Sequence, residues 1–200
     1  MRANGGCPFA TDPALTALEA SVYWTPAADP GTILISAAPT ATADHALASP
    51  LPGRDRRRDG GDTYERIEVA DATFPAIVQA ELRSGTLLAA IILLDDDAVD
   101  RMDALTRFLL ALKRRRVPPD SRLTPQRRIR LRQMLRTVDG RREGATYRAI
   151  AEALFPDHQI ETSSFAGNAL RETTIRLARD GMKLVGGGYR ALLRKPRRPQ

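Results

Sequence analysis

Short apolar runs separated by turn-forming residues dominate the first half of the chain, and this pattern predicts β-strands. Polar and apolar positions alternate in "TYERIEV", as in a half-buried strand, whereas "TLLAAIILL" is apolar on both faces and is predicted to be a central strand. The link "RSG" predicts a hairpin between the last two runs. Residues 39–62 lack periodicity and are predicted to form a long loop. The predicted strands cover residues 32–38, 63–69, 76–82 and 86–94.

A helical period follows the last of these strands. Four apolar residues recur at i, i+3, i+7 and i+10, and this spacing predicts that they form the buried face of one helix. They are Met102, Leu105, Leu109 and Leu112. The next segment, "VPPD", cannot continue a helix because it contains two prolines. We therefore expect residues 1–117 to form a β-rich domain, a small antiparallel sheet with one helix, which serves oligomerisation or contact with a partner.

The second half of the chain shows helical periods alone. Thr124 and Thr146 precede two of these periods and are predicted N-caps. Asp139 and Gly140 are predicted to end the first helix. Its predicted core face consists of Leu131, Met134, Leu135 and Val138. The fold class is thus α+β, with an all-α helix-turn-helix domain over residues 118–195 and a disordered basic tail over residues 196–200.

Electric charge separates the two halves. Residues 113–200 contain 22 Lys and Arg against 8 Asp and Glu, a net charge of +14. Residues 1–112 contain 9 against 16, a net charge of −7. An acidic half joined to a strongly basic half indicates that the basic half meets a polyanion, and nucleic acid is the first candidate. The alternative is an ordinary solvated helical surface followed by a basic tail.

Other features exclude several classes of protein. Cys7 is the single cysteine, which excludes internal disulfides and a cysteine-based zinc site. The longest apolar run has eight residues, far fewer than the ~20 that a membrane helix needs. Neither His45 nor His158 has a partner at the spacing of a metal site or a catalytic triad. We therefore expect a cytoplasmic protein that is not an enzyme, has no membrane contact, and needs no cofactor or metal.

The segment "TYRAIAEALF" has the pattern of the scaffold helix in a helix-turn-helix motif. An ordinary packed helix can show the same pattern, but the basic surroundings and the helix that follows favour DNA. That following helix is the candidate reader, because its N-terminal part would contact base edges and because Asn pairs with adenine and Arg with guanine. The predicted base contacts are Ser163, Ser164, Asn168 and Arg171.

Basic side chains at helical spacing are the predicted phosphate contacts, which add affinity without sequence information. One set recurs at i, i+4 and i+8 along the first helix of this half, and another recurs at i, i+3 and i+7 along the third. The alternative for the third helix is a solvated face on which Glu172 and Asp180 form intrahelical pairs. The predicted phosphate contacts are Arg127, Arg128, Arg132, Arg136, Arg148, Arg176, Arg179, Lys183 and Arg190.

Residues 120 to 195 resemble a bacterial family, the RovC-like DNA-binding domain of type VI secretion transcription factors. The segments "LTPQRR", "TYRAIAEALF" and "GGYRALLR" carry the resemblance and occur in the family's order. The upstream "VYWTPAADPGTILISAAP" is similar to the family's usual lead-in. Related proteins regulate integrative and conjugative elements. The resemblance implies a helix-turn-helix transcription regulator, and it also implies that some members act by binding another regulator.

The sequence therefore predicts a transcriptional regulator that reads double-stranded DNA. The alternative is an anti-activator or adaptor that uses the same helical domain to bind another regulator protein. The further partners that we consider are a second copy in a homodimer or higher oligomer, a second regulator protein and RNA polymerase.

Overall fold

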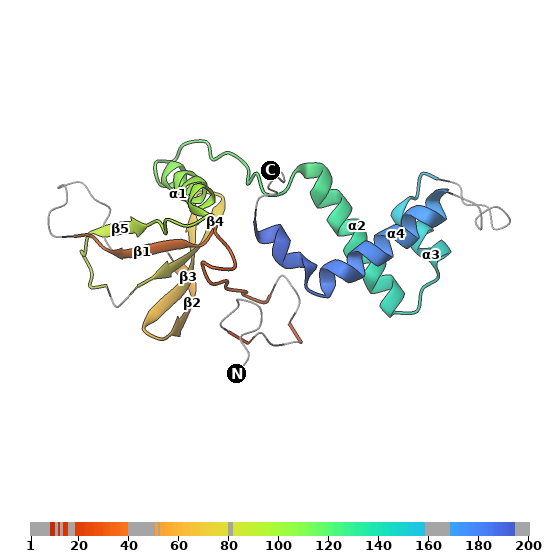
Figure 1. Cartoon of the computed structure of the whole chain (residues 1–200), viewed down its shortest axis with the longest axis horizontal. Coiled ribbons are helices and arrows are strands. Elements are labelled where there is room, and N and C mark those ends of the chain that lie inside the picture. The colour runs from red at the N-terminus through yellow and green to blue at the C-terminus, as the bar shows by residue number, and fades with distance from the viewer. Residues whose placement is uncertain are drawn as a thin grey trace. The chain divides into compact units, whose positions relative to one another are not determined.

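The computed structural model describes residues 9–10, 12, 14–15, 19–39, 51, 53–79, 82–158 and 169–194. The chain divides into two compact units, unit 1 (Met1–Pro119) and unit 2 (Asp120–Gln200) (Figure 1). The described part of unit 1 contains a five-stranded sheet and a helix, and that of unit 2 contains helices, so the fold is α+β. The predicted basic tail, residues 196–200, lies outside the described residues.

Unit 1 is built on a mixed sheet with the strand order β2-β3-β4-β1-β5. Its strands are β1 (Ile33–Ala37), β2 (Gly53–Asp59), β3 (Asp62–Val69), β4 (Ala72–Val78) and β5 (Leu88–Ile91). β1 pairs with β4 in parallel, and the other pairs of neighbouring strands are antiparallel. The prediction of an antiparallel sheet was therefore wrong. Two successive hairpins, β2–β3 and β3–β4, bring β4 into the sheet in the direction of β1.

The strand predicted at 76–82 is shifted, because the central strand β4 lies at Ala72–Val78, and the other failed strand predictions concern the two edges of the sheet. Residues 39–62, predicted to form a loop, contain β2, whose sequence "GRDRRRD" has no apolar period because the strand lies exposed at an edge. Gly60 and Gly61 both have positive φ, as a two-residue hairpin turn requires. β5 lies at the other edge rather than in the centre, and it pairs with β1, so the predicted hairpin with 76–82 does not form. The strands predicted at 32–38 and 63–69 are confirmed.

Helix α1 (Ala98–Leu112) covers one face of this sheet (Figure 1). Its Phe108 packs edge to face on Phe74, with 5.3 Å between the ring centroids. Ile33, Ile35 and Ile67 belong to the same core. The opposite face of the sheet carries a second, aromatic cluster. Its members are Tyr23, Leu34, Tyr64 and Ile77, with Phe9 packed against them.

The buried face of α1 agrees with the predicted one at Leu105 and Leu112, which pack against the core, and differs from it elsewhere. Ala104, Phe108 and Ala111 are buried against the sheet, whereas Met102 and Leu109 are 57% and 46% exposed. The helix has apolar residues on two faces, so periodicity alone did not select the correct one. Phe108 decides the orientation because its ring offers the largest apolar area to the sheet.

Arg101 attaches α1 to the loop that precedes β1. The side chain is buried, and its guanidinium donates to the carbonyl oxygen of Pro26 at 3.0 Å and to Asp95 Oδ2 at 2.8 Å. Chiefly because of this hydrogen bond from Arg101, the pKa of the Asp95 carboxyl is lowered. Both hydrogen-bonding ends of the buried guanidinium are thus satisfied, as a buried cation requires.

Unit 2 contains α2 (Pro125–Arg142), α3 (Tyr147–Leu154), α4 (Ala169–Val185) and the 3₁₀ helix η2 (Gly188–Leu193). Both predicted N-caps are confirmed, because each threonine hydroxyl accepts a backbone N–H of the first turn at 3.2 Å. The predicted stop of α2 at Asp139 and Gly140 was wrong. A Cβ at Gly140 would lie 3.1 Å from Ile150 Cγ1, so this glycine permits close packing of α3. The chain turns instead at Gly144, which has a φ of +84°.

No helix among the described residues is long and apolar enough to cross a membrane. No group of three or more His, Cys, Asp or Glu in the same residues is placed to hold a metal ion.

Candidate nucleic-acid interface

Helices α2 and α4 cross at Gly181, and this crossing orients the basic side chains of both. A Cβ at Gly181 would lie 2.8 Å from Val138 Cγ2 and 2.9 Å from the carbonyl oxygen of Met134, so only glycine allows the two backbones to approach this closely. At the edge of the contact, Arg130 Nη2 lies 3.3 Å from Asp180 Oδ2. The buried faces of the two helices therefore point toward each other.

The exposed face of α4 carries one basic stripe. Leu177, Ala178 and Gly181 of this helix are buried. Arg176, Arg179 and Lys183, which we call the α4 stripe, lie on the opposite side by the 3.6-residue period and are exposed. In the described part of the chain, Arg179 alone of these three has a carboxylate within ion-pair distance, Asp180 at 3.4 Å. The other two side chains of the α4 stripe, Arg176 and Lys183, are thus available to bind an anion outside the protein.

The exposed face of α2 carries a second basic stripe, which differs in its neighbours. Arg128, Arg132 and Arg136, the α2 stripe, are exposed on the side of α2 opposite its buried residues. Ile129 and Leu135 flank them and are 56% and 54% exposed. The prediction that Leu135 belongs to the core was therefore wrong. Arg136 also donates to the carbonyl oxygen of Ala153 at 3.4 Å.

The structure does not bring the two predicted phosphate-binding stripes onto one surface. Each stripe lies opposite the face that its helix buries, and the two helices bury those faces against each other at Gly181. The α2 stripe and the α4 stripe therefore point in opposite directions across unit 2. A straight duplex lying on one of them is out of reach of the other.

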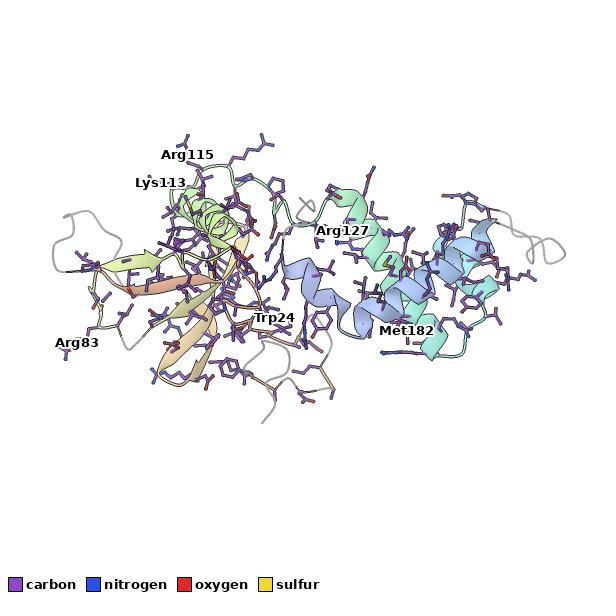
Figure 2. All side chains as sticks on the ribbon, in the orientation of Figure 1. Trp24, Arg83, Lys113, Arg115, Arg127 and Met182 are labelled. Carbon is purple, nitrogen blue, oxygen red and sulfur yellow. The ribbon has the colours of Figure 1, made fainter. Side chains whose placement is uncertain are left out.

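The remaining predicted contacts have separate environments. Arg171, on the first turn of α4, forms an ion pair with Glu172 at 3.1 Å, and Arg148 forms one with Glu152 at 2.8 Å. Arg127, at the start of α2, is half-buried (Figure 2). Arg190 is exposed on η2. The other predicted base contacts lie outside the described residues. They are Ser163, Ser164 and Asn168.

Helix α3 is held in unit 2 by small and aromatic residues. Ala151 is fully buried and Ile150 is 5% exposed, as their position in "TYRAIAEALF" suggested. The guanidinium of Arg141 lies 4.5 Å from the centroid of the Tyr147 ring, a cation–π contact. Gly181, the crossing point, is a functional position that was not predicted from the sequence. Its signal was a glycine in register with a buried apolar stripe inside a helix.

Comparison with known proteins gives one family match, which begins within unit 1 and continues through unit 2. A family model for the DNA-binding domain of type VI secretion system transcription factors, RovC, matches residues 91–194. Searches of curated proteins and of solved structures gave no match. The matched residues include α1 and the four helices that the structure describes in unit 2, and they make up more than half of the chain. The chain therefore belongs to the RovC-like family of transcription-factor DNA-binding domains.

Proposed function

We propose that the protein is a cytoplasmic transcriptional regulator that reads duplex DNA through a helix-turn-helix made of α3 and α4. The observation that carries this proposal is the α4 stripe, because α4 buries four central residues on one face and exposes three basic side chains on the other. A recognition helix needs this division, since one side must hold the helix on its scaffold while the other enters the major groove.

In this arrangement α4 has two roles. Arg171 contacts base edges together with Ser163, Ser164 and Asn168, which precede α4 in the sequence. The α4 stripe, with Arg148 and Arg190, contacts phosphates and sets the register of the protein on the duplex. Residues 118–195 form the DNA-binding part in this scheme, and residues 1–117 contact a partner or a second copy.

The direct test is selection of bound sequences from a random duplex pool with the full chain, followed by titration against the selected duplex. We expect one enriched motif, and we expect affinity for it to fall steeply as salt rises, because each phosphate contact releases a counterion. Salt-sensitive binding without an enriched motif would show that the protein binds DNA without sequence specificity. Failure to bind any duplex at low salt would refute the proposal.

A second candidate function rests on the α2 stripe. Duplex DNA offers phosphates but no apolar surface along its backbone, whereas Ile129 and Leu135 stand beside the arginines of this stripe. An acidic, amphipathic protein surface would satisfy both kinds of side chain. The α2 stripe therefore favours a regulator protein or RNA polymerase as a partner, in the manner of an adaptor.

The two candidate functions respond to different substitutions. If the protein is an adaptor, Ile129→Ser with Leu135→Ser should lower its affinity for the protein partner and leave its affinity for DNA unchanged. A pull-down of an interacting regulator that survives this double substitution would argue against the α2 stripe as the docking surface.

A further inference from the structure

Helix α1 has an exposed apolar stripe that the DNA-binding proposal does not use. Val99, Met102 and Leu109 are 74%, 57% and 46% exposed, and Thr106 is exposed between them. We call these four residues the α1 outer stripe. Large apolar side chains gathered on one exposed helix face are a common mark of a protein contact.

The spacing of the stripe fits a second helix. Positions 99, 102, 106 and 109 are separated by three, four and three residues, which is the a/d spacing of a two-stranded coiled coil. Helix α1 has 15 residues and is about 22 Å long, so the stripe spans most of its length. The other face of the same helix is already occupied by the sheet of unit 1.

Charge along α1 indicates which helix would dock there. Residues 95–103 contain five Asp and one Arg, and residues 104–116 contain five Lys and Arg and no acid. Lys113 and Arg115 stand at the C-terminal end of α1 and are exposed (Figure 2). A helix with one acidic and one basic end is complementary to a copy of itself that runs in the opposite direction. A parallel copy would place acid against acid and base against base.

We propose that α1 docks against α1 of a second copy in antiparallel orientation, around a two-fold axis. The heptad spacing then pairs Val99 with Leu109 of the second copy and Met102 with Thr106 of the second copy. In this orientation the acidic end of each α1 lies beside the basic end of the other. The interface is self-complementary, so every contact occurs twice, as in other two-fold dimers.

Nucleic acid does not fit this surface, because the acidic end of the stripe would repel phosphate. An unrelated basic helix would satisfy that end but would leave Lys113 and the following arginines unmatched. The inference is independent of DNA binding, because it rests on unit 1 residues and is measured without DNA.

Sedimentation velocity on the full chain tests the association. We expect a reversible dimer of the unmodified chain, and we expect Met102→Glu with Leu109→Glu to raise its dissociation constant about 100-fold, since each lost contact counts twice. Met182→Glu is the control, because this side chain is similarly exposed on α4 and belongs to neither basic stripe. The control should dimerise like the unmodified chain. An unmodified chain that stays monomeric at roughly 100 µM would overturn the proposal.

Cross-linking tests the orientation. In a Cys7→Ser background, chains carrying Met102→Cys are mixed with chains carrying Thr106→Cys and oxidised. The antiparallel register predicts a disulfide dimer in the mixture and little in either chain alone, because only the mixed pair places two sulfurs within bonding distance. Efficient dimers from each chain alone would identify a parallel pair and would overturn the antiparallel proposal. Unchanged unfolding curves for all variants would show that the fold is intact, as expected for exposed positions.

Discussion

The α2 stripe and the α4 stripe look alike in sequence and differ in the folded unit. Each consists of three basic side chains at helical spacing on the face opposite the buried one. The α4 stripe has charged neighbours, Glu172 and Asp180, whereas the α2 stripe has exposed Ile129 and Leu135 beside it. The crossing at Gly181 then directs the two stripes away from each other.

This difference teaches that a basic stripe does not define a binding surface by itself. Helical period assigns side chains to a face of their own helix, but the packing of that helix decides which faces of the domain coincide. Two DNA-binding measurements test whether α4 binds DNA while α2 does not, and two unfolding measurements test the packing and exposure of the residues beside the stripes.

The largest difference should come from removing each stripe. Arg176→Ala, Arg179→Ala and Lys183→Ala together should weaken duplex binding about 100-fold near physiological salt and lower the slope of log K against log salt by about 2 to 3. The same three-alanine change in the α2 stripe should alter affinity by less than about threefold. Fluorescence anisotropy over a salt series measures both. Equal losses of duplex affinity from the two substitutions would show that both stripes contact DNA. The duplex would then have to wrap around unit 2.

Substitution of the crossing residue should affect both stripes through stability. Gly181→Ala gains about 1 kcal/mol of helix propensity, but its methyl would meet Val138 and the backbone of Met134. We expect a net loss of about 2 kcal/mol in the free energy of unfolding, measured by urea titration. Met182→Ala, at the exposed neighbouring position, should change it by less than about 0.5 kcal/mol. A neutral Gly181→Ala would mean that the helices can separate at this point.

Arg171→Ala should separate base reading from phosphate contact within α4. We expect about a tenfold loss of affinity for the selected duplex, the lower end of the range for one base contact, and little change on random duplex. Competition binding with both duplexes gives the ratio. Equal losses on the two would place Arg171 among the phosphate contacts. Glu172→Ala is the useful control, because it frees Arg171 from its ion pair without removing it.

The smallest effect is expected from the apolar residues of the α2 stripe. Ile129→Ser with Leu135→Ser should change the free energy of unfolding by less than about 0.5 kcal/mol, because both side chains are more than half exposed. Thermal unfolding of the double variant is the measurement. A larger loss would show that these side chains are covered within the native protein, and the α2 stripe would then be a less accessible surface.

Local chemistry explains what could be predicted from the sequence. Thr124 and Thr146 cap their helices through atoms within three residues, so the sequence contains all the necessary information. Strand β2 could not be predicted, because its charged side chains are exposed at an edge and leave no apolar alternation. The position of β5 depends on its pairing with the distant β1.

The candidate site was predictable in the same limited way. Periodicity placed Arg132 and Arg179 on exposed helix faces, and the structure agrees that both are exposed. It could not reveal that these faces point apart, because that depends on a contact between Gly181 and Val138, which are distant in the sequence. The prediction that Leu135 is buried failed for a related reason. Three other residues, Met134, Thr137 and Val138, already fill the side of α2 that meets α4.

The contacts of Arg122 determine how unit 2 can be used in protein engineering. Its guanidinium binds Asp120 at 2.6 Å and the carbonyl oxygen of Leu193 at 3.0 Å, so the first and last described turns of the unit are joined by one side chain. A segment whose ends meet can be cut at a distant loop and rejoined at those ends, or inserted into a surface loop of another protein, without stretching its helices. Unit 2 is thus suited to circular permutation and grafting.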